Sequence, residues 1–165
     1  MRVIEASGGA VTIGAPPRLD SLELIRHTGP DAAIVAAGRA PGDDGELPVR
    51  LASTGWTAVV LLTRHASPAV LRRARRAGVM ALLLEPLFPP QVGPTLDLAV
   101  ARFRDLNRLK QALAERRVVD RAKGQLMARA GLSEEEAFRW LRRRAMDTRS
   151  RIGEVARALL ERTTG

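Results

Sequence analysis

The chain of 165 residues contains no cysteine and no tyrosine, and it has only three phenylalanines and two tryptophans. Without cysteine there is no disulfide framework, no cysteine-ligated metal site and no thiol nucleophile, and a reducing cytoplasm is the expected location. So few aromatic side chains exclude a wide platform for stacking nucleic-acid bases. No apolar run reaches the roughly 18 residues that a membrane-spanning helix needs, and no signal-peptide pattern opens the chain, so we expect no membrane association.

Motifs for catalysis and cofactor binding are also missing. His27 and His65 have no neighbouring carboxylate or hydroxyl pattern of a catalytic triad, and the sequence holds no HExxH, GxxxxGK[ST] or GxGxxG motif. Asp43, Asp44 and Glu46 offer carboxylates to a cation, but they lack the spacing of a calcium loop, and a solvated loop is the alternative. We therefore predict no catalytic residue, no metal site and no cofactor.

What the chain has in excess is positive charge. It carries 27 lysines and arginines against 18 acidic residues, which gives a formal net charge of +9. The excess is uneven, with +2 before Thr95 and +7 from Thr95 onward. Such a field attracts polyanions, above all nucleic acid. An arginine-rich composition without any ligand would explain the preference for arginine over lysine, but it would not explain the asymmetry.

Residues 1–90 alternate apolar runs with helical stretches. The runs in "DAAIVAAG", "WTAVVLLT" and "VMALLLEP" have the continuous hydrophobicity of buried parallel strands, and "LDSLELIRH" and "SPAVLRRARRAG" are the predicted helices. In the second helix Ser67 is the expected N-cap, Pro68 the first helical residue and Gly78 the residue beyond the end. The segment "GRAPGDDGELP", 38–48, is expected to be a loop. This pattern predicts an α/β domain with a parallel sheet.

After Pro90 the pattern changes to one long helix. Hydrophobic residues at spacings of three, four, three and seven predict the seam of a dimerising coiled coil over residues 91–117, formed by Leu96, Ala99, Phe103, Leu106 and Leu113. The alternative is a single helix that packs on its own N-terminal domain. The same periodicity fits both arrangements.

Residues 118–165 carry three apolar stripes, which predict a compact all-α unit of three helices. Gly131 ends the first helix, and Ser133 with Glu136 forms a capping box at the start of the second. The second helix is expected to bury Phe138, Leu141 and Ala145, and to bury Trp140 in part.

The segments "PDAAIVAAGR" and "VVLLTRHASPAVLRRARRAGVMALLLEPL" resemble the last three strands of a bacterial response-regulator receiver domain. The resemblance implies a flavodoxin-like sheet with a phosphoacceptor Asp ending the third strand, a Thr or Ser ending the fourth, and Lys-Pro after the fifth. Thr63 and Pro86 fit, but Ala36 occupies the phosphoacceptor position and Glu85 replaces the lysine. Because Ala36 cannot be phosphorylated, we expect a truncated pseudo-receiver that works through a regulatory protein partner.

The segment from Glu115 to Leu160 contains "RAKGQLM", "GLSEEEAF" and "LRRRAMD" and resembles the ANTAR domain of AmiR and NasR type transcription antitermination regulators. The resemblance implies a three-helix RNA-binding module, usually dimeric through a preceding coiled coil. Such a module stabilises stem-loops in nascent leader mRNA and so prevents an overlapping terminator hairpin. The alternatives are a DNA-binding three-helix regulator and an adaptor that binds only proteins.

The residues expected to contact RNA lie on the first two helices of this unit and on the turn that follows, namely Arg121, Ala122, Lys123, Gly124, Arg142, Met146, Arg149 and Arg151. At 100° per residue, Arg142 and Met146 fall away from the core side of their helix. A glycine inside a helix costs about 1 kcal/mol relative to alanine, so Gly124 implies either close approach to RNA or close packing on the next helix. For Met146 the alternative is a side chain that closes the edge of the bundle.

Overall fold

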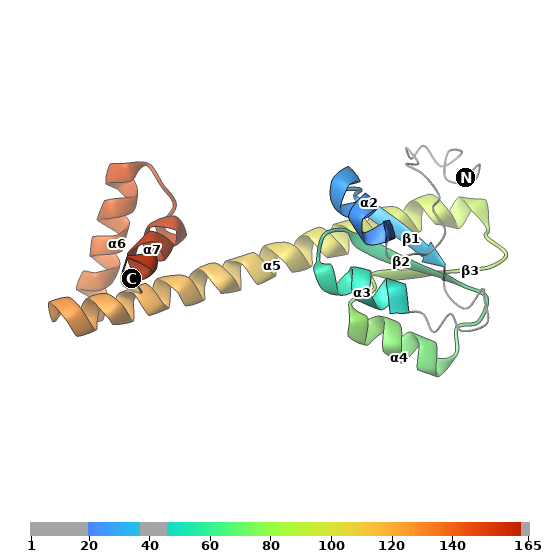
Figure 1. Ribbon diagram of the computed structural model, residues 1–165, viewed down its shortest axis with the longest axis horizontal. Coiled ribbons are helices and arrows are strands. Elements are labelled where there is room, and N and C mark those ends of the chain that lie inside the picture. Colours follow the sequence, from blue (N-terminus) through green and yellow to red (C-terminus); the bar gives the residue numbers. More distant parts are fainter. Residues whose placement is uncertain (1–19, 37–45, 163–165) are drawn as a thin grey trace. The chain divides into compact units, whose positions relative to one another are not determined.

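The computed structural model describes residues 20–36 and 46–162. Their elements follow the order α2 (Asp20–Thr28), β1 (Ala32–Ala36), α3 (Glu46–Thr54), β2 (Ala58–Thr63), α4 (Pro68–Ala77), β3 (Ala81–Leu84), α5 (Pro89–Ala130), α6 (Glu134–Thr148) and α7 (Ile152–Glu161) (Figure 1). The chain forms two compact units, unit 1 over Met1–Asn107 and unit 2 over Arg108–Gly165. The predicted domain limits at residues 90 and 117 stay predictions.

In the described part of unit 1, three parallel strands form a sheet in the order β1-β2-β3. The central strand β2 is buried along almost its whole length, as its continuous apolar run predicts. Just before it, the hydroxyl of Thr57 donates a hydrogen bond to the carbonyl oxygen of Pro30 at 2.7 Å. This bond satisfies a buried polar group and holds the start of β2 beside the start of β1. The predicted α/β domain with a parallel sheet is confirmed.

Helices cover both faces of this sheet. On one face α2 and α3 pack against the strands, with a core of Val35, Leu51 and Val59. On the other face α5 packs against them, with a core of Ala58, Val60, Leu83, Val92 and Ala99. Successive strand residues point to opposite faces, and this alternation divides the two cores. The first part of α5 is therefore a layer of unit 1.

The helix α4 begins and ends as its sequence predicts. The hydroxyl of Ser67 accepts a hydrogen bond from the backbone N–H of Val70, Pro68 is the first helical residue, and Gly78 ends the helix in the left-handed conformation with φ 86°. The predicted loop over 38–48 needs a correction, because α3 already begins at Glu46. Leu47 and Leu51, one turn apart, reach the core and make these residues helical. Residues 37–45, with Asp43 and Asp44, lie outside the described residues.

The predicted dimer seam on α5 divides into two parts. Ala99 is fully buried, and Leu96 and Phe103 pack beside it against the sheet of unit 1. These three residues cover their own sheet, so the prediction that they face a second chain is corrected. Leu106 and Leu113 are 45% and 51% exposed and stay candidates for the seam.

In unit 2, α6 and α7 pack on the C-terminal part of α5 around Val119, Ala122, Leu141 and Ala156. The predicted capping box is confirmed. The hydroxyl of Ser133 accepts a hydrogen bond from the backbone N–H of Glu136 at 3.3 Å, and the backbone N–H of Ser133 donates to the Glu136 carboxylate at 2.8 Å. The hydroxyl of Ser133 also donates to the same carboxylate at 2.7 Å, and this bond, followed by the bond from the Ser133 backbone N–H, lowers the pKa of Glu136.

The buried face of α6 differs from the prediction at one position. It consists of Ala137, Leu141 and Ala145, which follow one another at a spacing of four. Phe138 is 44% exposed, so its predicted burial is wrong. The small side chains of Ala137 and Ala145 let the helices approach closely, and the bulky phenyl ring of Phe138 lies on the neighbouring side of the helix.

Candidate nucleic-acid interface

One side of α6 carries three exposed side chains at a spacing of four, Phe138, Arg142 and Met146, which we call the α6 stripe. Met146 is 70% exposed and Phe138 is 44% exposed. Residues four apart on a helix lie one above the other, so the three side chains form one surface. The guanidinium of Arg142 can pair with a phosphate, and the apolar side chains of Phe138 and Met146 can pack on an unstacked base. Sequence reasoning placed Phe138 in the core, although its spacing from Arg142 and Met146 links it to this surface.

Arg149 continues the positive charge into the turn after α6. It is the C-cap of that helix and holds the left-handed conformation with φ 51°, and it is the one residue other than glycine with positive φ in the described ranges 20–36 and 46–162. An L-residue in this conformation costs about 1–2 kcal/mol, which glycine would avoid. Arg151 follows as the N-cap of α7, where its backbone N–H donates to the Glu154 carboxylate at 3.1 Å. Both arginines are exposed.

Lys123 is held by two carboxylates. Its side chain is 16% exposed, and its Nζ lies 2.8 Å from Glu134 Oε1 and 2.9 Å from Asp120 Oδ1. The hydrogen bonds to Glu134 and to Asp120 raise the pKa of Lys123. The hydrogen bond from Lys123 is also the main cause that lowers the pKa of Asp120. Because Glu134 opens α6, Lys123 joins α5 to α6 and is engaged inside the protein.

The other residues of α5 that were predicted to contact RNA differ from one another in burial and position. Ala122 is fully buried in the core of unit 2, so it has no surface that RNA could touch. Arg121 is exposed, but it lies about 200° around the helix from Lys123, on nearly the opposite side. Gly124 is exposed, and a Cβ built on it would meet no atom within 4 Å. This open space excludes close packing on the next helix as the reason for a glycine.

Arg121, Arg142 and Arg149 share one property. None of them forms an ion pair with another residue in the described part of the chain, in contrast to Lys123.

Within residues 20–36 and 46–162, no cluster of three acidic or histidine side chains is placed to hold a metal ion. Nor does any helix there have the length and hydrophobicity to span a membrane.

The carboxyl edge of the sheet in unit 1 holds Ala36, Thr63 and Glu85. Ala36 ends β1, Thr63 ends β2, and Glu85 follows β3. The backbone N–H of Glu85 donates to the carbonyl oxygen of Thr63 at 3.0 Å, and its carboxylate accepts a hydrogen bond from Arg64 Nε at 3.1 Å. At the positions that the resemblance to a receiver assigns to an Asp and a Lys, this chain has Ala36 and the arginine-bound Glu85.

Comparisons with known proteins agree with this architecture. Residues 107–160 match the family model of the ANTAR domain. The transcriptional regulatory protein PdtaR of Mycobacterium tuberculosis is 34% identical over 149 residues, which cover 86% of this chain and 73% of that protein. The aliphatic amidase regulator of Pseudomonas aeruginosa is 31% identical over 142 residues, 82% of this chain and 65% of that protein. The nitrate regulatory protein of Klebsiella oxytoca is 50% identical over 52 residues, 32% of this chain and 13% of that protein.

Solved structures of a receiver domain and of a response regulator are similar in fold to this chain. The signal receiver domain of the response regulator NarL from Mycobacterium tuberculosis has a TM-score of 0.50 and 29% identity, covering 59% of this chain and 82% of that chain. The response regulator StyR has a TM-score of 0.51 and 12% identity, covering 98% of this chain and 90% of that chain. At that identity, the likeness to StyR is one of fold alone.

Proposed function

The chain belongs to the ANTAR-domain transcription antitermination regulators, and on this premise we propose that unit 2 binds stem-loops in nascent leader mRNA. The observation that supports the proposal is the α6 stripe, because exposed Phe138, Arg142 and Met146 lie on the module that matches the ANTAR domain. Side chains do not reach bases in the deep major groove of A-form RNA, so selective proteins read exposed loop bases. By holding a stem-loop, the protein prevents an overlapping terminator hairpin from forming.

The residues divide into two roles in this proposal. Those that contact RNA are Arg121, Arg142, Met146, Arg149 and Arg151, together with Phe138 and the backbone at Gly124. Arginine suits phosphate because its five donors match phosphate oxygens in a fixed fork. Ala122 and Lys123 position the helices, the first from the core and the second through Glu134.

Competition among three nucleic acids tests the proposal. We expect the full chain to bind a leader RNA stem-loop more tightly than the same stem with an altered loop, and more tightly than duplex DNA. Tightest binding to duplex DNA would favour a DNA-binding regulator. Absence of binding to all three would favour an adaptor that binds only proteins, and equal affinity for all three would end the claim of selective recognition.

Control by aspartyl phosphorylation of unit 1 is not part of the proposed mechanism. Ala36 has no carboxylate to attack a phosphoryl donor, and Glu85 is bound to Arg64 in place of a lysine that would stabilise phosphoryl oxygens. Incubation with acetyl phosphate and Mg²⁺ is therefore expected to leave the intact mass unchanged. An acid-labile adduct on unit 1 would contradict this part of the proposal.

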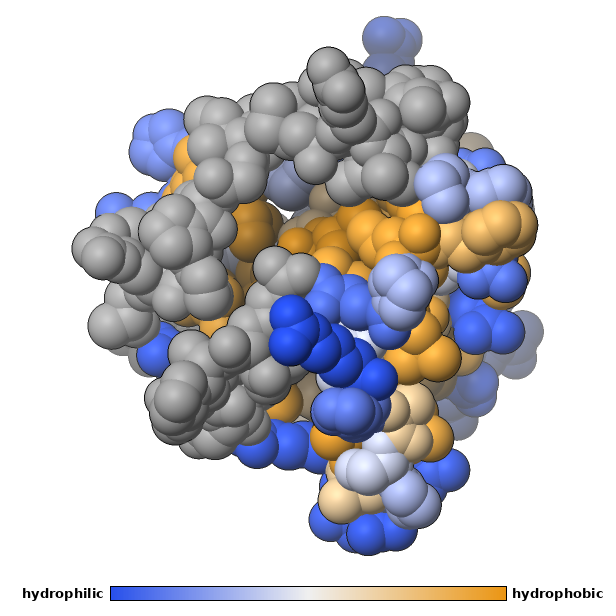
Figure 2. All heavy atoms as spheres, turned by 90° about the vertical axis from the view of Figure 1, so that its right-hand side faces the viewer, coloured by the Kyte–Doolittle hydropathy of each residue, from blue (hydrophilic) through white to orange (hydrophobic). Residues whose placement is uncertain are grey.

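We propose that a regulatory protein partner controls the chain through unit 1 instead. Leu84, at the end of β3, is 50% exposed, and Phe88, just before α5, is 59% exposed. Figure 2 shows a face of unit 1 on which hydrophobic surface lies beside hydrophilic side chains. Exposed apolar area rimmed by polar groups is typical of protein interaction surfaces.

We also propose a homodimer through α5. Leu106, Leu109 and Leu113 follow one another at spacings of three and four, the repeat of a coiled-coil seam. All three are exposed, with Leu109 at 59%. A second copy would remove this apolar surface from water.

A further inference from the structure

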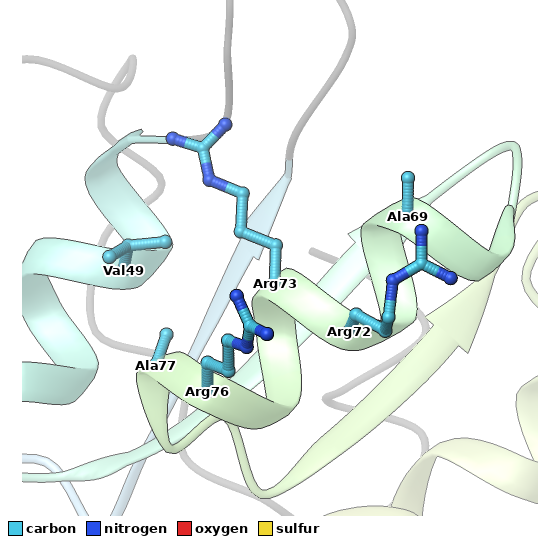
Figure 3. A pocket seen from close by; sticks show the side chains of 6 residues that line it. All are labelled: Val49, Ala69, Arg72, Arg73, Arg76 and Ala77. Atoms are coloured by element: carbon cyan, nitrogen blue, oxygen red, sulfur yellow. The ribbon is translucent and has the colours of Figure 1, made fainter.

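Between α3 and α4, unit 1 has a hollow of about 350 Å³. It is lined by Val49 of α3 and by residues of α4 at the spacing of one helix face, Ala69, Arg72, Arg73, Arg76 and Ala77. Figure 3 shows the side chains of Arg72, Arg73 and Arg76 rising from the same side of α4, with Val49 across from them. The hollow is therefore lined by small apolar side chains and by guanidinium groups.

The helix α4 carries charge of one sign only. The helix has four arginines within five residues and no acidic residue, in the segment PAVLRRARRA. Arg72 and Arg76 lie one turn apart, and neither forms an ion pair with a residue in 20–36 or 46–162. Like charges one turn apart destabilise a helix. A bound anion between them would remove that repulsion.

The lining of the hollow indicates which anion fits. Among the described residues that line the hollow, all the polar groups are guanidiniums on exposed residues, and none is a buried polar side chain that would read the shape of a small molecule. Arginine forks bind phosphate oxygens in pairs. The hollow thus suits a chain of phosphates better than a single enclosed ligand.

We propose that this surface, the α4 arginine hollow, binds phosphodiester groups of the RNA whose loop unit 2 recognises. The inference rests on the proposed function, because the RNA is the same. Contacts to phosphates position a protein on nucleic acid and add affinity without reading its sequence. Unit 1 thereby contributes to RNA binding, although its receiver-like edge lacks a phosphoacceptor.

The test uses the full chain and the slope of log K against log salt concentration. Arg72→Ala/Arg76→Ala removes two phosphate contacts, so the slope is expected to become shallower by about 2. The affinities for the leader stem-loop and for its loop-altered form are expected to fall by the same factor. Arg26→Ala/Arg75→Ala removes the same charge from exposed positions of unit 1 outside the hollow and should leave the slope unchanged.

An unchanged slope in the hollow variant, or an equal change in the control, would overturn the inference. So would an increase in thermal midpoint with inorganic tripolyphosphate that depends on Arg72 and Arg76 while the RNA slope does not, because the hollow would then serve free phosphates. The two proposals fail differently. A wild-type chain that ignores the loop sequence contradicts the proposed function, whereas a selective chain with an unaffected slope contradicts only the role of the hollow.

Discussion

The ammonium group of Lys123 lies 2.8 Å from the carboxylate of Glu134, eleven residues further along the chain. Asp120 completes the arrangement at 2.9 Å on the preceding turn of α5. Glu134 is the first residue of α6, so the contact joins two helices of unit 2 at the point where the chain turns. A lysine that the sequence predicts to contact RNA is thus held by two carboxylates of its own unit.

Lys123→Ala is expected to lower the thermal midpoint of unit 2, because the carboxylates of Asp120 and Glu134 would lose their partner. RNA affinity should fall only as far as the folded fraction falls. Lys110→Ala, which removes the other lysine of α5, is the matched control and should leave the midpoint unchanged. Weaker RNA binding by Lys123→Ala with an unchanged midpoint would restore Lys123 to the interface.

The same contact predicts a dependence of stability on pH. The pKa of Lys123 is raised from 10.5, so its contribution is present below that value and is lost as the pH rises through the raised pKa. The pKa of Asp120 is lowered from 3.8, so its contribution is present above that value and is lost as the pH falls through the lowered pKa. The difference in midpoint between wild type and Lys123→Ala should therefore be constant between these two values and shrink above pH 10.5 and below pH 3.8. A difference that does not change with pH would show that the charges are not its cause.

Two glycines of unit 2 are expected to respond to alanine with opposite signs. Gly124→Ala should raise the free energy of unfolding by about 1 kcal/mol, because the new Cβ meets open space on a helix. Gly153→Ala should lower it by about 1–3 kcal/mol, because the new Cβ would lie 2.7 Å from Cγ and 2.6 Å from Oε1 of Glu115. Urea unfolding measures both changes.

RNA binding tests whether Gly124 is needed for the close approach of RNA to the backbone of α5. If RNA approaches the backbone there, Gly124→Ala gives a more stable protein with weaker binding to the stem-loop. Unchanged binding would remove Gly124 from the interface and leave the glycine without a function in RNA recognition.

Arg149→Gly should likewise raise stability and reduce binding. Glycine adopts the left-handed conformation without steric cost, so we expect a gain of about 1 kcal/mol in the free energy of unfolding. The loss of a charged side chain from the turn should weaken binding to the stem-loop severalfold. Arg149→Lys keeps the charge and the strained backbone and should stay close to wild type in both measurements. Full RNA affinity in Arg149→Gly would show that the arginine serves another purpose.

The proposed dimer depends on the exposed leucines of α5. Leu109→Glu/Leu113→Glu should convert the dimer to a monomer in analytical ultracentrifugation, because two carboxylates would be buried at the seam. Leu98→Glu changes an exposed leucine of the same helix that lies outside the seam, and it should stay dimeric. A wild-type chain that is monomeric at every concentration would contradict the seam.

Local signals predicted most of the elements. Continuous apolar runs identified the three described strands, and the caps at Ser67 and Ser133 fixed where α4 and α6 begin. These features depend on residues within a few positions of one another. The helix α3 was missed because it begins inside the turn-rich segment 38–48 and, with nine residues, is too short to show a clear helical period.

Contacts between distant residues explain the errors. Leu96, Ala99 and Phe103 have the spacing of a dimer seam, and the same spacing serves a helix that covers a sheet. The pairing of Lys123 with Glu134 depends on how α6 folds back along α5. Phe138 lies one residue from the buried Ala137, and a rotation of about 100° separates exposure from burial.

A comparison of two arginines of α6 tests whether the α6 stripe recognises RNA. Arg142 belongs to the α6 stripe, whereas Arg144 is exposed about 200° around the helix, on nearly the opposite side. The measurement is the affinity of the full chain for the leader stem-loop and for its loop-altered form. We predict that Arg142→Ala loses about tenfold in affinity for the stem-loop, or about 1.4 kcal/mol, while Arg144→Ala loses little and both variants keep the wild-type thermal midpoint. Equal losses in the two variants, or no loss in Arg142→Ala, would contradict recognition of RNA by the α6 stripe.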